Sequence, residues 1–214
     1  MKKAGLLLFH AFLALSFFLS GACKKSAEEL LVSAAKHPET VEKLDLGLGK
    51  LGVVPDVLFR FPNLKWLDLR LNLLKSLPDN SGDWNKLEYL NVYGNDLNLL
   101  PPSFRNLSAL RIFLAGNNDF ERIPEELTDL PLEALYLDQN KLKWGEEDVA
   151  IIGRLHRLEI LDISKNLKIV SLPKNIGALA DHPKLRVLIL KDTGLRTADV
   201  EIARKTLPKI RIEF

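Results

Sequence analysis

Three glycines near the start of the chain have the spacing of a phosphate-binding loop. Gly47, Gly49 and Gly52 lie in LDLGLGKLG and form a G-x-G-x-x-G pattern directly after a strand-like Leu-Asp-Leu. In a dinucleotide-binding unit such glycines admit the pyrophosphate to the start of a helix, and an acidic residue about twenty positions later holds the ribose hydroxyls. Asp68 stands at that distance. A nucleotide-binding protein is therefore one hypothesis, provided that a helix follows the glycines.

No other pattern in the chain is typical of catalysis. The four histidines, His10, His37, His156 and His182, are scattered, and Cys23 is the only cysteine. The sequence contains no H-E-x-x-H, no Cys-His ligand spacing and no G-x-S-x-G. It therefore offers no candidate residues for metal-dependent hydrolysis or for nucleophile-elbow catalysis. We expect no enzyme activity, no cofactor, no metal and no small-molecule substrate.

The elements that position these residues come from an internal repeat that governs nearly everything after residue 40. The pattern Leu-x-x-Leu-x-Leu-x-x-Asn-x-Leu recurs seven times, and LPKIRIEF from Leu207 forms a truncated closing unit. The first three intervals are 23 residues, the fourth is 22, and the next two are 26 and 27. The repeats start at Val41, Leu64, Leu87, Leu110, Leu132, Leu158 and Leu185.

This pattern resembles the leucine-rich repeat family. An apolar-Pro pair in the second half of several repeats, as in SLPDNSGDWNKL and RIPEELTDLPL, is similar to the 23-residue-repeat leucine-rich repeat lipoproteins of Leptospira-type spirochaetes. The resemblance implies an α/β solenoid, curved into a horseshoe arc, with a concave parallel β-sheet of about eight strands. Turns and short helices are then expected on the convex side, and an N-terminal capping helix at the start.

The repeat positions have a physical interpretation of their own. The fourth and sixth residues of each unit alternate inward on a short strand, so stacked units form a parallel sheet. An amide at the ninth position both donates and accepts hydrogen bonds, and can tie each turn to the next. The prolines that follow fix φ on the outer return and prevent a long helix there. The expected asparagine ladder consists of Asn72, Asn95, Asn118, Asn140 and Asn166.

The repeat also places the three glycines. Gly47 and Gly49 occupy positions seven and nine of the first unit, and Asp68 occupies position five of the second. Val53, Val54 and Pro55 follow Gly52 in step with the other apolar-Pro pairs, so we expect no helix there to receive a phosphate. The nucleotide hypothesis is therefore disfavoured.

Positions three, five and seven of each unit point outward on the concave sheet. In the middle units they bring aromatic and apolar residues side by side, bordered by polar ones, which is typical of a contact site. The alternative is that a parallel sheet carries apolar residues outward without any partner. The predicted protein-binding face consists of Trp66, Asp68, Arg70, Tyr89, Asn91, Tyr93, Ile112, Leu114, Tyr136 and Asp138.

Both ends of a solenoid need caps. Ser26 and Glu29 form a capping box that opens SAEELLVSAAKH, which favours an N-terminal capping helix over a helix lying on a membrane. WGEEDVAIIGRLHRL and TADVEIARKTL have helical spacing and predict convex helices. The last strand, IRIEF, exposes an edge unless another element covers it. The charged side chains of Arg211 and Glu213 would disfavour pairing of this edge with a strand of another molecule.

The first residues have the order of an export signal: Lys2 and Lys3, an apolar run from Ala4 to Leu19, then small residues before Cys23. An uncleaved membrane anchor is the alternative, although the run is short for one. The lone Cys23 resembles the lipidated cysteine of a bacterial lipoprotein, with Ser20 where leucine is usual; ordinary cleavage would leave a free thiol. We predict a signal peptide over 1–22, a lipidated N-terminus and capping helix over 23–40, and a repeat domain over 41–214.

Charge excludes one class of partner. Removal of residues 1–22 takes away two lysines and no acid, which leaves 28 basic and 28 acidic residues. Nucleic-acid binding would need a basic surplus, so none is expected. The resemblance implies a non-catalytic module that binds a host or bacterial protein. We expect a membrane contact through Cys23, in the outer membrane or at the cell surface rather than the inner membrane, or secretion if Cys23 is not lipidated. An architectural envelope protein without a concave ligand remains the alternative.

Overall fold

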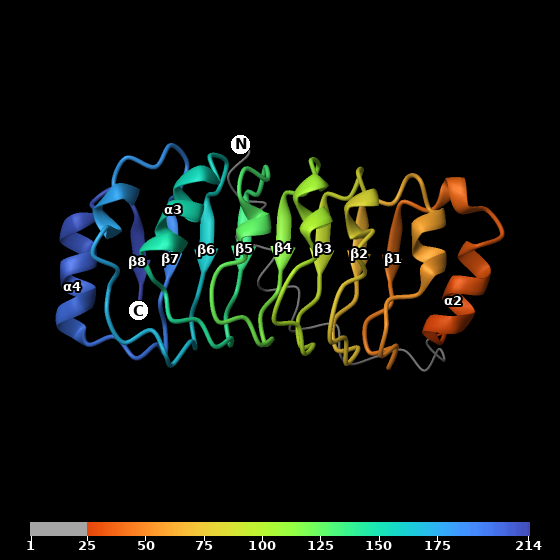
Figure 1. The fold of residues 1–214 in the computed structure, drawn as a ribbon, viewed down its shortest axis with the longest axis horizontal. Coiled ribbons are helices and arrows are strands. Elements are labelled where there is room, and N and C mark those ends of the chain that lie inside the picture. Colours follow the sequence, from red (N-terminus) through yellow and green to blue (C-terminus); the bar gives the residue numbers. More distant parts are fainter. Residues whose placement is uncertain (1–24) are drawn as a thin grey trace, which may run out of the picture.

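The computed structural model describes residues 25–214 as one arc of stacked repeats (Figure 1). The predicted signal peptide and Cys23 lie outside the described residues. The strands form a single parallel sheet in the order of the sequence, which confirms the predicted fold class. They are β1 Lys43–Asp45, β2 Trp66–Asp68, β3 Tyr89–Asn91, β4 Ile112–Leu114, β5 Ala134–Tyr136, β6 Ile160–Asp162, β7 Val187–Ile189 and β8 Arg211–Glu213.

In the parallel sheet, residues at the same position of successive repeats pair with each other. Trp66 pairs with Tyr89, Tyr89 with Ile112, and Leu114 with Tyr136. Residues at the same repeat position therefore form columns across the sheet, because successive side chains of a strand alternate between its two faces. The fourth and sixth positions, such as Leu67 and Leu69, are fully buried in one continuous core.

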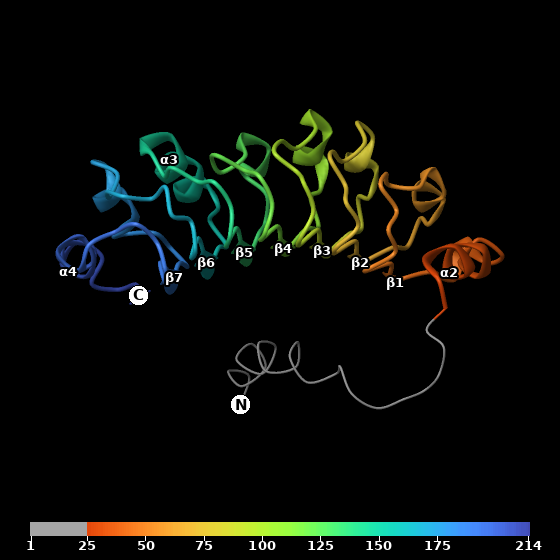
Figure 2. The same cartoon turned by 90° about the horizontal axis from the view of Figure 1, so that it is seen from below.

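The outer side of the arc consists mainly of 3₁₀-helices, and Figure 2 shows them opposite the strands, which line the inner side. Proline stands immediately before several of them, as Pro55, Pro101 and Pro124 do. The fifth repeat, with its 26-residue interval, has a true α-helix there, α3 Glu146–Arg154. The 3₁₀-helices are η1 Pro38–Thr40, η2 Asp56–Arg60, η3 Ser81–Asp83, η4 Pro102–Asn106, η5 Glu125–Leu127 and η6 Ile176–Leu179.

The ninth-position asparagines are buried and bridge neighbouring turns. Asn118 accepts a hydrogen bond from Leu97 N–H of the preceding repeat at 3.0 Å, and its Nδ2 donates to Val92 C=O of that repeat at 3.0 Å. Asn95, Asn140 and Asn166 repeat this arrangement. Each amide thus satisfies backbone groups that the tight turn leaves without partners.

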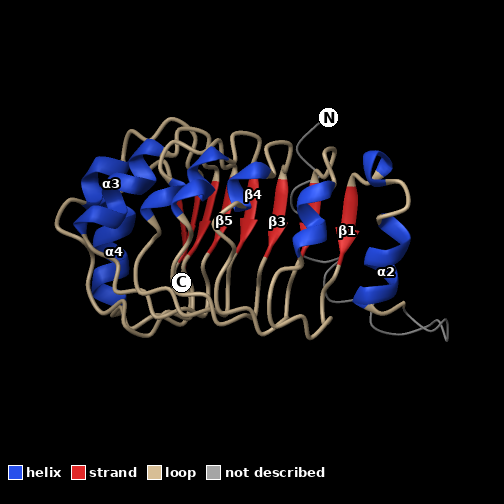
Figure 3. Cartoon of the chain, turned by 45° about the vertical axis from the view of Figure 1, so that its right-hand side comes forward, coloured by secondary structure: helices blue, strands red, loops and turns tan. Residues whose placement is uncertain are grey.

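Helices lie at both ends of the array (Figure 3). At the start, α2 Ala27–Ala34 has the expected capping box between Ser26 and Glu29 and buries Leu31. At the other end, α4 Thr197–Thr206 buries Val200 and Ala203 completely and lies beyond β8 (Figures 1 and 2). The edge of the last strand is therefore partly covered by α4 as well as flanked by charges.

Candidate functional site

The glycine motif is a packing feature of the first repeat. A β-carbon on Gly49 would lie 2.8 Å from Ala27 Cβ of the capping helix, and one on Gly47 would lie 3.0 Å from Arg70 Cγ. Gly52 has a φ of +68°. The next helical turn, η2, starts only after Pro55 and is a short 3₁₀-helix. These glycines therefore admit the cap and neighbouring side chains, and no helix N-terminus follows them to receive a phosphate.

The N-terminal half of the concave face has a stacked aromatic pair. The rings of Trp66 and Tyr89 lie 4.8 Å apart and almost parallel, with an interplanar angle of 7°. Lys43 Nζ lies 4.1 Å from the centre of the Trp66 ring, within the range of a cation–π contact. Tyr89 is 8% exposed, whereas Trp66 is half-buried. Tyr89 thus supports Trp66, which presents the accessible aromatic surface; burial raises the pKa of Tyr89 to about 12.

The polar side chains at position five accept hydrogen bonds from the backbone where each strand ends. Asp68 accepts a hydrogen bond from Arg70 N–H at 2.9 Å, and Asn91 accepts one from Tyr93 N–H at 3.0 Å. Asp45 and Asp162 cap the N–H group two residues later in the same way. Asp68 and Asn91 are each only 1% exposed. Both residues, predicted as part of the binding face, lie on it but are covered by their neighbours.

Arg70 covers Asp68 and forms an ion pair with it. Asn91 Nδ2 also donates to Asp68 Oδ2 at 3.1 Å. Burial raises the pKa of Asp68, and the hydrogen bond and charge of Arg70 oppose that rise. Arg70 itself retains 30% of its side-chain surface exposed. Of this polar group, Arg70 is the member that can reach a partner.

An apolar band continues through the C-terminal half of the face. Ile112, Leu114 and Tyr136 are half-buried and in register. Burial raises the pKa of Tyr136 to about 12, so the phenol stays neutral. The band extends beyond the predicted face to three further half-buried residues. They occupy the same third and fifth positions, a signal already present in the sequence: Ile160, Val187 and Ile189.

Tyr93 and Asp138 border this band at position seven. Tyr93 Oη donates to Gln139 Oε1 at 3.0 Å. Asp138 lies against Gly116, where a β-carbon would come within 2.3 Å of Asp138 Oδ1. Burial, and then the charge of Asp162, raise the pKa of Asp138 to about 6. Its carboxylate forms no ion pair with another residue of the described chain, and the charge of Lys165 offsets the rise of its pKa only in part.

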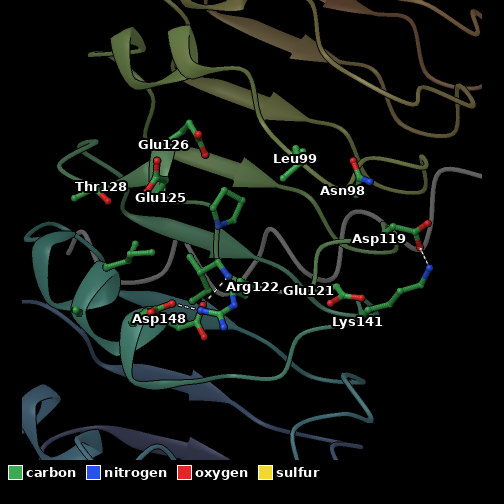
Figure 4. Close-up of a pocket in the computed structure, with 15 residues that line it drawn as sticks. Asn98, Leu99, Asp119, Glu121, Arg122, Glu125, Glu126, Thr128, Lys141 and Asp148 are labelled. Carbon is green, nitrogen blue, oxygen red and sulfur yellow. Dashed lines mark hydrogen bonds and ion pairs between the residues drawn. The ribbon is translucent and has the colours of Figure 1, made fainter.

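The convex side has a cleft of about 930 Å³ between η5 and α3 (Figure 4). It opens where a short 3₁₀-helix is followed by a longer α-helix. Its charges are largely satisfied internally: Arg122 pairs with Glu147, Lys141 with Asp119, and Asp148 accepts from Ile123 N–H at 2.8 Å. These charged groups therefore already have partners within the chain.

Within residues 25–214, no three His, Cys, Asp or Glu side chains are grouped to hold a metal ion. Among the helices described there, none has the length and apolar character to cross a bilayer.

Comparisons with known proteins agree with the geometry. Residues 39–97 match the leucine rich repeat family model. A leucine-rich repeat protein of Leptospira interrogans aligns over 82% of this chain and 43% of its own, with 30% identity and a TM-score of 0.71. The ectodomain of the receptor kinase GASSHO1/SCHENGEN3 of Arabidopsis thaliana, in complex with Casparian strip integrity factor 2, aligns over 73% and 19%, with 29% identity and a TM-score of 0.59. PEPR1–AtPEP1 aligns over 75% and 22%, with 28% identity and a TM-score of 0.58.

No curated protein sequence matches the chain. The chain also spans less than half the length of the Leptospira protein and about a fifth of each plant receptor. The family match, the repeats and the sheet lead to one assignment. The chain is a leucine-rich repeat protein, and it resembles a leucine-rich repeat protein of Leptospira interrogans.

Proposed function

We propose that this protein is a non-catalytic binding protein, exported and lipid-anchored to a bacterial cell envelope, that holds a protein partner on its concave face. The observation that carries the proposal is the register of that face. Aromatic and apolar side chains lie side by side from Trp66 on β2 to Ile189 on β7. Most of these side chains are half-buried, and a band of partly accessible apolar surface of this kind often marks a contact site.

The chemistry of the face favours a polypeptide ligand. Trp66, Arg70 and Tyr136 belong to the residue types that most often dominate binding energy at protein interfaces. They border a band of aliphatic side chains that suits apolar side chains of a partner. The GASSHO1/SCHENGEN3 ectodomain was solved in complex with Casparian strip integrity factor 2, which supports a binding role for this chain. Adhesion or host contact is the role that we propose for this binding.

Membrane attachment is proposed from the sequence. Cys23 is the single cysteine, follows an apolar segment and small residues, and precedes the capping helix by only a few residues. Several acyl chains at about 0.8 kcal/mol per buried methylene would anchor the protein stably. Detergent-phase partitioning tests this: the wild type should enter the detergent phase, and Cys23→Ala should remain in the aqueous phase. Equal partitioning of both would contradict lipidation.

The binding proposal is tested by crosslinking on intact cells followed by pull-down. Trp66→Ala and Tyr136→Ala remove concave side chains that are half-buried and lie outside the core. We expect both variants to lose the crosslinked partner while their circular dichroism spectra and melting temperatures stay close to wild type. Truncation of such an interface residue typically costs roughly 2 kcal/mol or more of binding.

Phe59→Ala is the matched control. Phe59 stacks on Trp84 on the convex side at 4.8 Å and 4°, across the first and second repeats, whereas the Trp66–Tyr89 stack joins the second and third. Its replacement should leave capture intact. If the concave variants retain capture, the concave-face assignment fails and the architectural alternative is favoured.

A further inference from the structure

A group of exposed leucines lies on the side of the solenoid where the strands end. Position eight has a positive φ in every repeat. In the first two repeats this position is Leu48 and Leu71, with φ of 64° and 55° and exposures of 52% and 41%. Leu73, two residues later, has a φ of 60° and is 63% exposed. We name Leu48, Leu71 and Leu73 the lateral leucine patch.

Leucine is a poor choice for these positions on folding grounds. A left-handed backbone disfavours residues with a bulky side chain, whereas glycine, asparagine and aspartate tolerate it. The later repeats have Gly94, Asn117 and Asp192 among their residues at position eight. The three leucines are only partly covered within the chain, since 41% to 63% of their surface stays exposed. Unfavourable backbone conformation combined with exposed apolar surface indicates a contact with another apolar phase.

The residues around the lateral leucine patch indicate that this apolar phase is a lipid bilayer. Leu48 and Leu71 lie in adjacent turns, where Leu48 N–H donates to Arg70 C=O at 2.9 Å. Lys25, Lys50 and Lys75 are exposed in the same two repeats and the start of the cap, and none forms an ion pair within residues 25–214. In the next repeat Asp96 takes the place of Leu73, which bounds the patch. Exposed leucines flanked by free lysines suit the interface of a bilayer with anionic lipids.

The start of the described chain lies beside this patch. Lys25, Ser26 and Ala27 line the same small cavity as Leu48 and Gly49. Figures 1 and 3 show the capping helix starting at the edge of the solenoid where the strands end. Cys23 is two residues before Lys25, a span of at most about 7 Å of chain. A lipid on Cys23 therefore brings the bilayer to this side of the molecule.

We propose that the lateral leucine patch lies on the surface of the membrane that anchors Cys23, an inference that rests on the membrane attachment proposed above. Contact at this side leaves the concave face open, because the patch lies at the strand exits and the binding face on the strands. The two surfaces act together: the leucines and lysines orient the solenoid on the bilayer, and the concave face remains accessible to a protein partner.

The test uses the full acylated protein in vesicles of phosphatidylcholine and phosphatidylglycerol. A nitroxide label is placed on Leu71→Cys or on the control Ile202→Cys, an apolar residue of the C-terminal helix α4 that is 54% exposed. For the nitroxide at position 71, we expect the rate of collision with oxygen to rise severalfold relative to the rate of collision with a water-soluble nickel complex. At position 202 the label should remain in water. Equal exposure to water at both positions would overturn the inference, as would protection at position 71 in solution without vesicles, which would indicate a protein contact.

A second variant separates loss of contact from loss of fold. Leu48→Asn and Leu73→Asn, introduced together with Leu71→Cys, suit the left-handed backbone and should fold normally. We expect the label at position 71 to return to water in this variant. Mass spectrometry of Cys23 distinguishes the two failures: an unmodified Cys23 contradicts the anchor, whereas an acylated Cys23 with position 71 in water contradicts the leucine contact alone.

Discussion

At the scale of single residues, Asp138 is a partly buried carboxyl group of the concave face whose pKa is raised. Its folded-state pKa is raised from 3.8 to about 6, first by burial and then by Asp162, with Lys165 opposing. The folded state therefore binds this proton more tightly than the unfolded state does. The resulting stabilisation is present below about pH 4 and is lost as the pH rises through about 6.

Asp138→Asn should remove this cost, because the amide has the same shape and no charge. Above about pH 6.5 we expect the variant to be more stable than the wild type, by roughly 1–2 kcal/mol after allowance for solvent screening. Near pH 4 the two should be almost equal. Urea unfolding at both pH values measures the difference. A difference that is the same at both would show that ionisation of Asp138 is not its cause.

The repeat pattern predicted which face of the sheet the binding-face residues occupy. It did not predict which of their side chains are accessible or which backbone groups they bind. Trp66 and Tyr89 occupy the same column, yet stacking covers Tyr89 and leaves Trp66 accessible. Asp68 and Asn91 look like surface groups in the pattern, but each caps a backbone N–H two residues later. Such differences depend on side-chain conformation and on backbone groups left unpaired at strand ends, which a repeat pattern does not record.

At the scale of elements, the exception in the asparagine ladder has a physical cause. Gly49 stands where the second to sixth repeats have asparagine, and the capping helix takes the space of that side chain. The first turn is still braced from the second repeat as in the rest of the ladder, because Asn72 Nδ2 donates to Leu46 C=O at 2.9 Å. What resembles a cofactor motif is the adjustment of the first repeat to its cap.

The consensus substitution Gly49→Asn should therefore destabilise the protein. Its β-carbon would lie 2.8 Å from Ala27 Cβ and 3.0 Å from Leu46 O, and overpacking of this kind costs about 1–3 kcal/mol. Ala27→Gly should relieve part of the clash. Urea unfolding of the two single variants and the double variant gives the coupling energy. Strictly additive effects, or stabilisation by Gly49→Asn, would contradict the contact between cap and turn.

The convex elements were partly predictable. Helical spacing predicted helices in the two segments that form α3 and α4, and the prolines predicted short turns elsewhere. The cleft beside α3 was not predicted. It depends on how a 3₁₀-helix and an α-helix of different width lie next to each other, and each repeat examined alone contains no information about that fit.

At the scale of the whole molecule, the fold was predictable because each repeat contacts mainly its neighbours. The strands pair only in sequence order, β1 to β8. A pattern that specifies one repeat therefore specifies the stack, and only the ends need separate solutions. The ends are closed by α2, which buries Leu31, and by α4, which buries Val200 and Ala203.

This architecture predicts that damage at one end stays local. Ala203→Glu places a carboxylate at a fully buried position of α4, where an unpaired charge is strongly unfavourable. Ile202→Glu, at an adjacent position that is 54% exposed, is the matched control and should have little effect. Hydrogen exchange measured peptide by peptide should accelerate on the order of tenfold or more in β7 and β8 with Ala203→Glu. Protection of β1 to β3 should remain, because their contacts lie several repeats away. A uniform loss of protection along the chain would instead show that the repeats unfold as one cooperative unit.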